Sequence, residues 1–257
     1  MTGQTAATPG LRAIGLNKAF GGLTVASNIN VDIRPGDRLA LIGPNGAGKT
    51  TFAGLVTGVL APNSGRVLLD GVDITGLTQP QRVKAGIVRT FQITTLLNTF
   101  TPREHVRLAI IERRNMGWRM FGNAAHFTDV EQEADHILRQ LKLHGDADLV
   151  TDILPYGKQR LVEIALALAL KPRILLLDEP AAGVPASESK IIIDAIRSLP
   201  NDLGILMIEH DMDLVFRFAS RIMVLVAGSI LTEGTPSEIA SDSRVRELYL
   251  GNAQREH

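Results

Sequence analysis

The sequence predicts an α/β fold in which a parallel sheet is covered on both faces. In the second half of the chain, short and continuously apolar runs alternate with helical patterns, which is typical of buried parallel strands. Earlier, one apolar run leads into a glycine-rich segment and then into a helical pattern. At 257 residues and 45% hydrophobic content, the chain can form one large domain or two small ones with a sizeable core.

Strand-like runs dominate the first 70 residues. Turn residues separate them at Pro35-Gly36-Asp37 and at Asp70-Gly71, where glycine, proline and aspartate favour tight turns. The predicted strands cover residues 12–14, 29–33, 38–42 and 66–69, and a helix is predicted to begin near residue 51.

The middle of the chain, about residues 93–154, has a helical pattern. Thr101-Pro102-Arg103-Glu104 and Thr128-Asp129-Val130-Glu131 are both capping boxes, which predict that helices begin there. The second predicted helix has an apolar stripe made of Val130, Ala134, Ile137, Leu138 and Leu141. We expect this helical segment to be inserted into the α/β body.

From Arg173 onward, strands and helices alternate again. The predicted order is a strand at 174–177, a helix at 191–199, a strand at 205–208 and a hairpin of strands 222–226 and 230–232 around Ala227-Gly228. Thr235-Pro236-Ser237-Glu238 is predicted to cap the last helix.

Composition excludes several classes of protein. Lys+Arg and Asp+Glu both total 27, and zero net charge argues against a broad nucleic-acid-binding surface. The chain has no cysteine, which excludes disulfides and thiolate metal sites. We find no signal-peptide pattern and no run of 18 apolar residues. We therefore expect a soluble, cytoplasmic protein that acts at a membrane, if at all, through a partner.

The glycine-rich segment fits the pattern G-x-x-x-x-G-K-[ST], the P-loop that binds a nucleoside triphosphate. It is formed by Gly43, Pro44, Asn45, Gly46, Ala47, Gly48, Lys49 and Thr50. A strand, loop and helix in this order aim backbone N–H groups at one point, where phosphates bind. Lys49 would reach the β- and γ-phosphates, and the Thr50 hydroxyl would ligate Mg²⁺. The alternative, a glycine-rich turn with an incidental lysine, does not account for the flanking strand and helix.

Two further predicted strands end in residues with suitable chemistry. The strand at 174–177 is followed by Asp178-Glu179-Pro180, so Asp178 could hold Mg²⁺ through its waters and Glu179 could polarise an attacking water. The strand at 205–208 ends before Glu209-His210, and the His210 ring could contact the γ-phosphate or the attacking water. Alone, an Asp–Glu pair would more often be an ordinary strand end, and a lone histidine would usually be structural.

Taken together, these motifs resemble the ATP-binding subunit of an ABC transporter over residues 11–251. Besides the P-loop, Thr90-Phe91-Gln92 resembles the Q-loop and residues 154–159 the family signature. Residues 177–180 resemble the Walker B segment, and His210 the switch histidine. The resemblance implies a RecA-like P-loop NTPase core with an antiparallel β subdomain and an inserted helical subdomain. Residues 1–91 and 158–257 would form the core of this single ABC ATPase domain, and residues 92–157 the helical subdomain.

The resemblance also implies the cofactors, ATP and Mg²⁺, and the roles of individual residues. Phe20 would lie against adenine with Val25 nearby, and Thr51 would join the P-loop residues around the phosphates. Gln92 would contact Mg²⁺ or the attacking water and link the site to the transmembrane partner. The implied catalytic residues are Lys49, Gln92, Glu179 and His210, and the implied metal ligands are Thr50, Gln92 and Asp178.

A second ATPase subunit, identical or homologous, is implied to close the site in trans. Its contacts would come from Pro155, Tyr156, Gly157 and Lys158, at the start of a helix whose N-terminal dipole points at the phosphate. This helix would bury Leu161, Ile164, Ala165 and Leu168. ATP would close the pair of subunits, and hydrolysis would reopen it.

The signature and the D-loop depart from the general family pattern. Pro155 stands where the family signature Leu-Ser-Gly-Gly-Gln has serine. Proline is favourable at a helix start, so it could simply stabilise the helix, and the functional cost would be one or two lost phosphate contacts of about 1–3 kcal/mol each. Pro185 stands where many relatives have an aspartate. Our hypothesis is that the site hydrolyses ATP with altered communication between subunits. Three segments resemble the ATPases of branched-chain amino acid importers, namely Leu-Pro-Tyr-Gly, Asp-Glu-Pro-Ala-Ala-Gly and Ile-Glu-His-Asp-Met. Similar proteins serve the transport of urea, amides or lipopolysaccharide.

The implied partners are transmembrane permease subunits, with a substrate-binding protein involved only indirectly and the chain peripheral to the cytoplasmic face of the membrane. A permease helix would enter the groove near residues 92–100. Residues 113–127 mix cations with apolar groups, which suits either a surface insertion or a contact with permease or lipid. Two alternatives remain open at this point. They are a soluble ABC protein acting on DNA or ribosomes, and a regulatory module that binds ATP without turnover.

Overall fold

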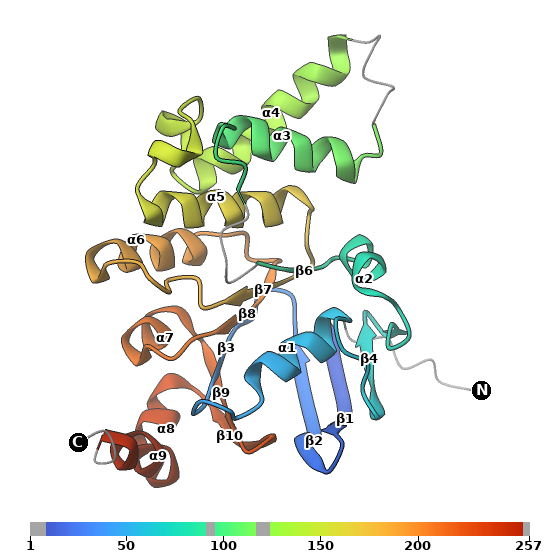
Figure 1. Ribbon diagram of the computed structural model, residues 1–257, viewed down its shortest axis with the longest axis vertical. Helices are drawn as coiled ribbons and strands as arrows, with labels where there is room; N and C mark the ends of the chain where they lie inside the picture. The colour runs from blue at the N-terminus through green and yellow to red at the C-terminus, as the bar shows by residue number, and fades with distance from the viewer. Residues whose placement is uncertain (1–8, 91–95, 117–123, 254–257) are drawn as a thin grey trace.

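The computed structural model describes residues 9–90, 96–116 and 124–253, and a six-stranded sheet forms its centre (Figure 1). Strands β6, β7, β8, β3 and β9 lie side by side and run parallel, and β10 pairs antiparallel with β9 at the edge. Their bounds are β3 (Arg38–Ile42), β6 (Ile87–Arg89), β7 (Ile174–Asp178), β8 (Gly204–Ile208), β9 (Arg221–Val226) and β10 (Ser229–Gly234). Every residue of β7 and β8 is buried, as expected for parallel strands covered on both faces.

An antiparallel sheet of four strands covers one side of this centre. It consists of β1 (Leu11–Phe20), β2 (Leu23–Ile33), β4 (Ser64–Leu69) and β5 (Val72–Asp73), in the order β2-β1-β4-β5. Helix α1 (Lys49–Thr57) contributes Phe52, Leu55 and Val56 to the hydrophobic core shared by the two sheets. Burying these side chains fixes the direction of α1, and therefore of the loop before it.

Helices cover the other face. A second hydrophobic core joins the central sheet to α5 (Tyr156–Ala169), α6 (Ala186–Arg197) and α7 (Met212–Phe218), and α3 (Pro102–Arg113) and α4 (Ala124–Gln140) pack beyond α5 (Figure 1). The remaining helical elements are α2 (Gln79–Ala85), η2 (His144–Asp146), η3 (Thr151–Ile153), α8 (Pro236–Ser241) and α9 (Ser243–Ala253). No helix in the described ranges is long and apolar enough to cross a bilayer.

The predicted fold class is confirmed, and most predicted elements form. The capping boxes of Thr101 and Thr235 both close in the structure. The prediction at Thr128 was wrong, because α4 begins four residues earlier at Ala124 and Thr128 lies within the helix. Two alanines, which favour helix strongly, extend α4 toward its N-terminus past the Thr128 box. Helix α6 begins at Ala186 rather than at residue 191, and no pattern predicted α2, β6 or α7.

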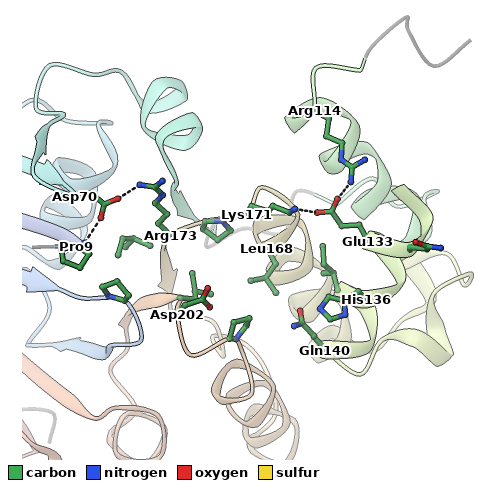
Figure 2. Close-up of a pocket in the computed structure, with 18 of the residues that line it drawn as sticks. Pro9, Asp70, Arg114, Glu133, His136, Gln140, Leu168, Lys171, Arg173 and Asp202 are labelled. Atoms are coloured by element: carbon green, nitrogen blue, oxygen red, sulfur yellow. Dashed lines mark hydrogen bonds and ion pairs between the residues drawn. The ribbon is translucent and has the colours of Figure 1, made fainter. Parts of the chain in front are cut away.

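A partly buried carboxylate joins the helices to one another. Glu133 of α4 accepts hydrogen bonds from the Arg113 guanidinium at 2.8 and 2.9 Å. It also pairs with Arg114 and with Lys171, whose Nζ lies 3.3 Å away (Figure 2). Arg113 also donates to the Ala169 carbonyl at 2.7 Å. Burial alone would raise the pKa of Glu133, but the hydrogen bonds from its arginine partners lower this pKa to about 2. The ionised carboxylate therefore stabilises the packing of α3, α4 and the end of α5.

Replacing Glu133 by Gln is expected to lower the free energy of unfolding at pH 7 by about 1–2 kcal/mol, a value reduced for solvent screening. Folding lowers the pKa of this carboxyl group. Its contribution to the free energy of unfolding is therefore fully present above the unfolded-state pKa and is lost as the pH falls toward about 2. Denaturant unfolding of both proteins between pH 7 and pH 3 should show the difference narrowing below about pH 5. The control is Glu131→Gln, a more exposed acid on α4. A difference that does not change with pH would contradict this explanation.

Candidate active site

The residues predicted to bind phosphates and metal lie at the carboxyl edge of the central sheet. The P-loop follows β3, Asp178 and Glu179 stand at the end of β7, and Glu209 and His210 follow β8. Strand β8 lies between β3 and β7, so the three segments leave the sheet side by side. Lys49 of the P-loop is within electrostatic range of the two acids at the end of β7. Burial lowers the pKa of Lys49, while Glu179 and Asp178 act electrostatically in the opposite direction.

Close backbone packing gives the P-loop its conformation. Gly43 has φ +154°, and a Cβ there would lie 2.1 Å from the Leu225 carbonyl oxygen. Gly48 has φ +104°, and a Cβ there would lie 2.5 Å from the Val25 carbonyl oxygen. Each of the two positions therefore requires glycine, because any side chain would clash with a backbone oxygen. Gly48 is also the N-cap of α1 and has no side chain to occupy the first amides of the helix, which favours an anion at this point.

Lys49 and Thr50 begin α1 beside this loop. The Lys49 ammonium donates to the Gly43 carbonyl at 2.7 Å and to the Pro44 carbonyl at 3.0 Å. It is therefore held over the loop rather than extended into solvent. Thr50 is exposed, so its hydroxyl is accessible to a ligand.

Three acids and one histidine lie at the ends of β7 and β8. The Asp178 side chain is only 2% exposed and forms an ion pair with Arg89 of β6. The Glu179 carboxylate lies 3.7 Å from His210 Nδ1, and the buried Glu209 carboxylate lies 3.6 Å from the same nitrogen. Burial raises the pKa of Glu209, although its carboxylate accepts a hydrogen bond from the His210 backbone N–H at 2.9 Å. The His210 ring itself is well exposed, which suits a residue that contacts a ligand.

The predicted adenine contact lies at the end of β1. Half of the Phe20 surface is exposed, and Lys18 Nζ lies 5.1 Å from the centre of its ring. The Val25 backbone packs against Gly48 and Gly228, which places β2 beside the P-loop. Phe20 pairs with Leu23 across the β1–β2 hairpin, and an exposed aromatic ring is a suitable surface for stacking a base.

The predicted signature begins α5 at Tyr156, with Pro155 at the N-cap, and the predicted stripe of Leu161, Ile164, Ala165 and Leu168 is buried. Two contacts there were not expected. The Gly157 N–H donates to Glu188 Oε2 at 3.2 Å, and Lys158 Nζ pairs with both carboxylate oxygens of Asp146 at 2.7 and 2.8 Å. The Gly157 N–H and the Lys158 ammonium would each have to change partners to meet a phosphate.

Sequence reasoning missed Arg89, Glu188 and Glu209. Arg89 stands immediately before Thr90-Phe91-Gln92, but only the sheet order places it against Asp178. Glu188 and Glu209 are acids with ordinary neighbours in the sequence, and their contacts depend on the packing of α5 on α6 and on the turn after β8. Gln92 lies outside the described residues.

The oxygen donors at this edge fit a metal bound together with a phosphate. No cluster of three His, Cys, Asp or Glu side chains able to hold a metal occurs among the residues described. Mg²⁺ does not require one, because it is typically bound by one or two carboxylates together with substrate phosphates and water. Asp178 already attracts a cation, and Thr50 supplies an accessible hydroxyl. The donor set therefore fits Mg²⁺ with a nucleotide.

A cavity of about 1030 Å³ lies elsewhere and is distinct from this site. It is lined by residues near the amino ends of β7 and β8, including Ile174 and Leu203, and by α4 residues such as His136 and Gln140 (Figure 2). Asp70 and Arg173 also line this cavity and form an ion pair with each other (Figure 2). The groups predicted to bind phosphate stand at the opposite ends of the same strands, so the volume of a cavity alone does not locate the active site.

Comparison with known proteins agrees with this geometry. A family model described as ABC transporter matches residues 26–182. The chain is 38% identical over 254 residues to the high-affinity branched-chain amino acid transport ATP-binding protein BraF of Pseudomonas aeruginosa, with 95% of this chain and 99% of BraF covered. Identity to the protein of the same description, LivG, of Escherichia coli is also 38% at the same coverage.

Solved structures are similar as well. The ADP conformation of an ATP-binding cassette of an ABC transporter superposes with a TM-score of 0.81 at 31% identity, covering 94% of this chain and 98% of that one. A nucleotide-free cassette from an ABC transporter gives 0.79 at 30% identity, covering 93% and 98%. From the family match, the relatives and the arrangement at the sheet edge, the chain belongs to the ABC transporter family as an ATP-binding subunit that hydrolyses ATP.

Proposed function

We propose that this ATPase powers a membrane transporter of branched-chain amino acids, from the cytoplasmic face of the membrane. The observation that carries the enzymatic part is the convergence of Lys49, Asp178, Glu179 and His210 at one sheet edge. The cargo is inferred from the names of relatives that match nearly the whole chain. An ATPase does not touch the cargo, so its own motifs carry no information about that cargo.

In this proposal each residue has one task. The P-loop amides and Lys49 bind the β- and γ-phosphates, and Phe20 stacks on adenine beside Val25. Glu179 accepts a proton from the attacking water, and His210 contacts the γ-phosphate or that water. Thr50 and Asp178 would hold Mg²⁺, which when bound neutralises phosphate charge.

A second subunit completes the site. Pro155, Tyr156, Gly157 and Lys158 would meet the γ-phosphate bound by the partner, so ATP closes the pair and hydrolysis reopens it. The start of α5 supports this role because Pro155, as the N-cap, has no side-chain hydrogen bond to the first helical amides. Glu188 is then the group that a phosphate has to replace at the Gly157 N–H.

An apolar surface that includes part of residues 96–100 supports docking of a permease helix. Leu97, Val150 and Ile153 are 51%, 37% and 65% exposed. Thr151 joins the two segments that carry them, because its hydroxyl donates to the Leu97 carbonyl at 3.1 Å and its N–H donates to the Phe100 carbonyl at 2.9 Å. Exposed apolar groups held together in this way are typical of an interaction site. We call these three side chains the docking patch.

Replacing Ile153 by Asp is expected to leave the ATPase rate of the isolated subunit within about twofold, because exposed substitutions of this kind perturb the fold little. Co-purification with the permease and uptake of labelled leucine into vesicles should both fall at least tenfold, because a charge would enter an apolar interface. The control is Val72→Asp on β5, which is similarly exposed at 64% and should change neither. Full uptake by Ile153→Asp would contradict the docking patch. Uptake of urea or acetamide in place of leucine would contradict the proposed cargo.

A further inference from the structure

Asp178, the proposed metal ligand, forms an ion pair with Arg89. The Asp178 side chain is 2% exposed, and that of Arg89 is 17% exposed. A carboxylate taken out of water to this extent requires a counter-charge. Lys49 interacts with it only at longer range, because its ammonium is hydrogen-bonded to the Gly43 and Pro44 carbonyls.

The backbone holds Arg89 in place. Strand β6 pairs in parallel with β7, with Arg89 opposite Leu176, and the next residue, Thr90, donates its N–H to the Leu176 carbonyl at 2.9 Å. The guanidinium therefore emerges beside Asp178 from the neighbouring strand of the same sheet. A group tethered in this way competes at a high effective concentration with any cation from solution. A guanidinium also stays charged and is weakly hydrated, which suits a buried pair better than an ammonium does.

We propose that Arg89 is a resident counter-cation of Asp178, which neutralises this carboxylate before the metal arrives and sets how tightly the metal is then held. The inference rests on the proposed role of Asp178 as a metal ligand. Metal and guanidinium draw on the electron density of the same carboxylate, so each weakens the binding of the other. Arg89 is thus a positioning residue. It acts through Asp178, with which it forms an ion pair.

The test uses Mn²⁺ as a probe for Mg²⁺, detected by electron paramagnetic resonance in the presence of ADP. Arg89→Met removes the charge and keeps the length of the side chain, and it is expected to bind Mn²⁺ about tenfold more tightly than wild type. Arg89→Lys keeps a charge without the planar fork and should lie between the two. Without metal or nucleotide, Arg89→Met should melt at least about 5 °C below wild type, because it leaves Asp178 buried and unpaired.

The matched control is Arg173→Met, which breaks another Arg–Asp pair, with Asp70, at an arginine side chain that is 65% exposed. It should change neither Mn²⁺ affinity nor melting temperature appreciably. If wild type binds Mn²⁺ with ADP and Arg89→Met binds it equally or more weakly, the inference is wrong while the proposed metal site stands. If wild type binds no Mn²⁺, the metal site itself is wrong. Should Arg89→Met not fold, the comparison of Arg89→Lys with wild type decides, because equal affinity and equal melting temperature would overturn the inference.

Discussion

Replacing Glu179 by Gln is expected to lower ATP turnover by about 10²–10⁴-fold while ATP binding changes little, because the substitution removes a general base and keeps its shape. The site supports this result. Glu179 follows Asp178 at the end of β7 and lies 3.7 Å from His210 Nδ1. Phosphate release measures turnover, and a fluorescent ATP analogue measures binding. Glu112→Gln, an exposed acid on α3, is the control. Turnover within a few-fold of wild type would remove Glu179 from the mechanism.

The same variant reports on assembly. Since its hydrolysis is blocked, a competent pair of subunits should remain closed in MgATP, and light scattering should then give the mass of a dimer. Such a dimer would mean that a signature with Pro155 can close a site on its own copy. A monomer that still binds ATP would instead indicate a different ATPase partner or a requirement for the permease.

Replacing Lys49 by Ala is expected to weaken ATP binding by about 100-fold, because one or two charge-assisted hydrogen bonds to phosphate are lost, each of about 1.5–3 kcal/mol. The loss should be larger for ATP than for ADP, since Lys49 is proposed to reach the γ-phosphate. Stability should change little. The ammonium donates to two carbonyls of its own loop, and its burial lowers its pKa.

Isothermal titration of both nucleotides into wild type and Lys49→Ala measures the difference. Lys158→Ala is the matched control, because Lys158 pairs with Asp146 and is proposed to act only in the partner's site. Equal ATP affinity in Lys49→Ala and wild type would mean that the loop carbonyls retain Lys49 and that the ammonium never reaches phosphate.

Elements whose cause lies in neighbouring residues could be predicted from the sequence. The apolar runs of β7 and β8, the glycine loop before α1 and the capping boxes of Thr101 and Thr235 all appear in the structure. Each depends on a hydrophobic period, a backbone conformation or a cap within a few residues. The error at Thr128 has the same origin. A capping box is a local preference, and the preceding alanines supply a competing one that extends the helix.

By itself, the sequence determined the family and the ATPase activity, and it predicted the phosphate-binding loop, because these depend on residue types at short spacings. Only the tertiary structure decided which charges meet. Arg89 contacts Asp178 because β6 lies beside β7, and Glu179 and Glu209 approach one His210 nitrogen because β7 lies beside β8. The physical reason is that strand order is set by burial of the whole sheet, an energy summed over many distant residues, and no short segment contains it.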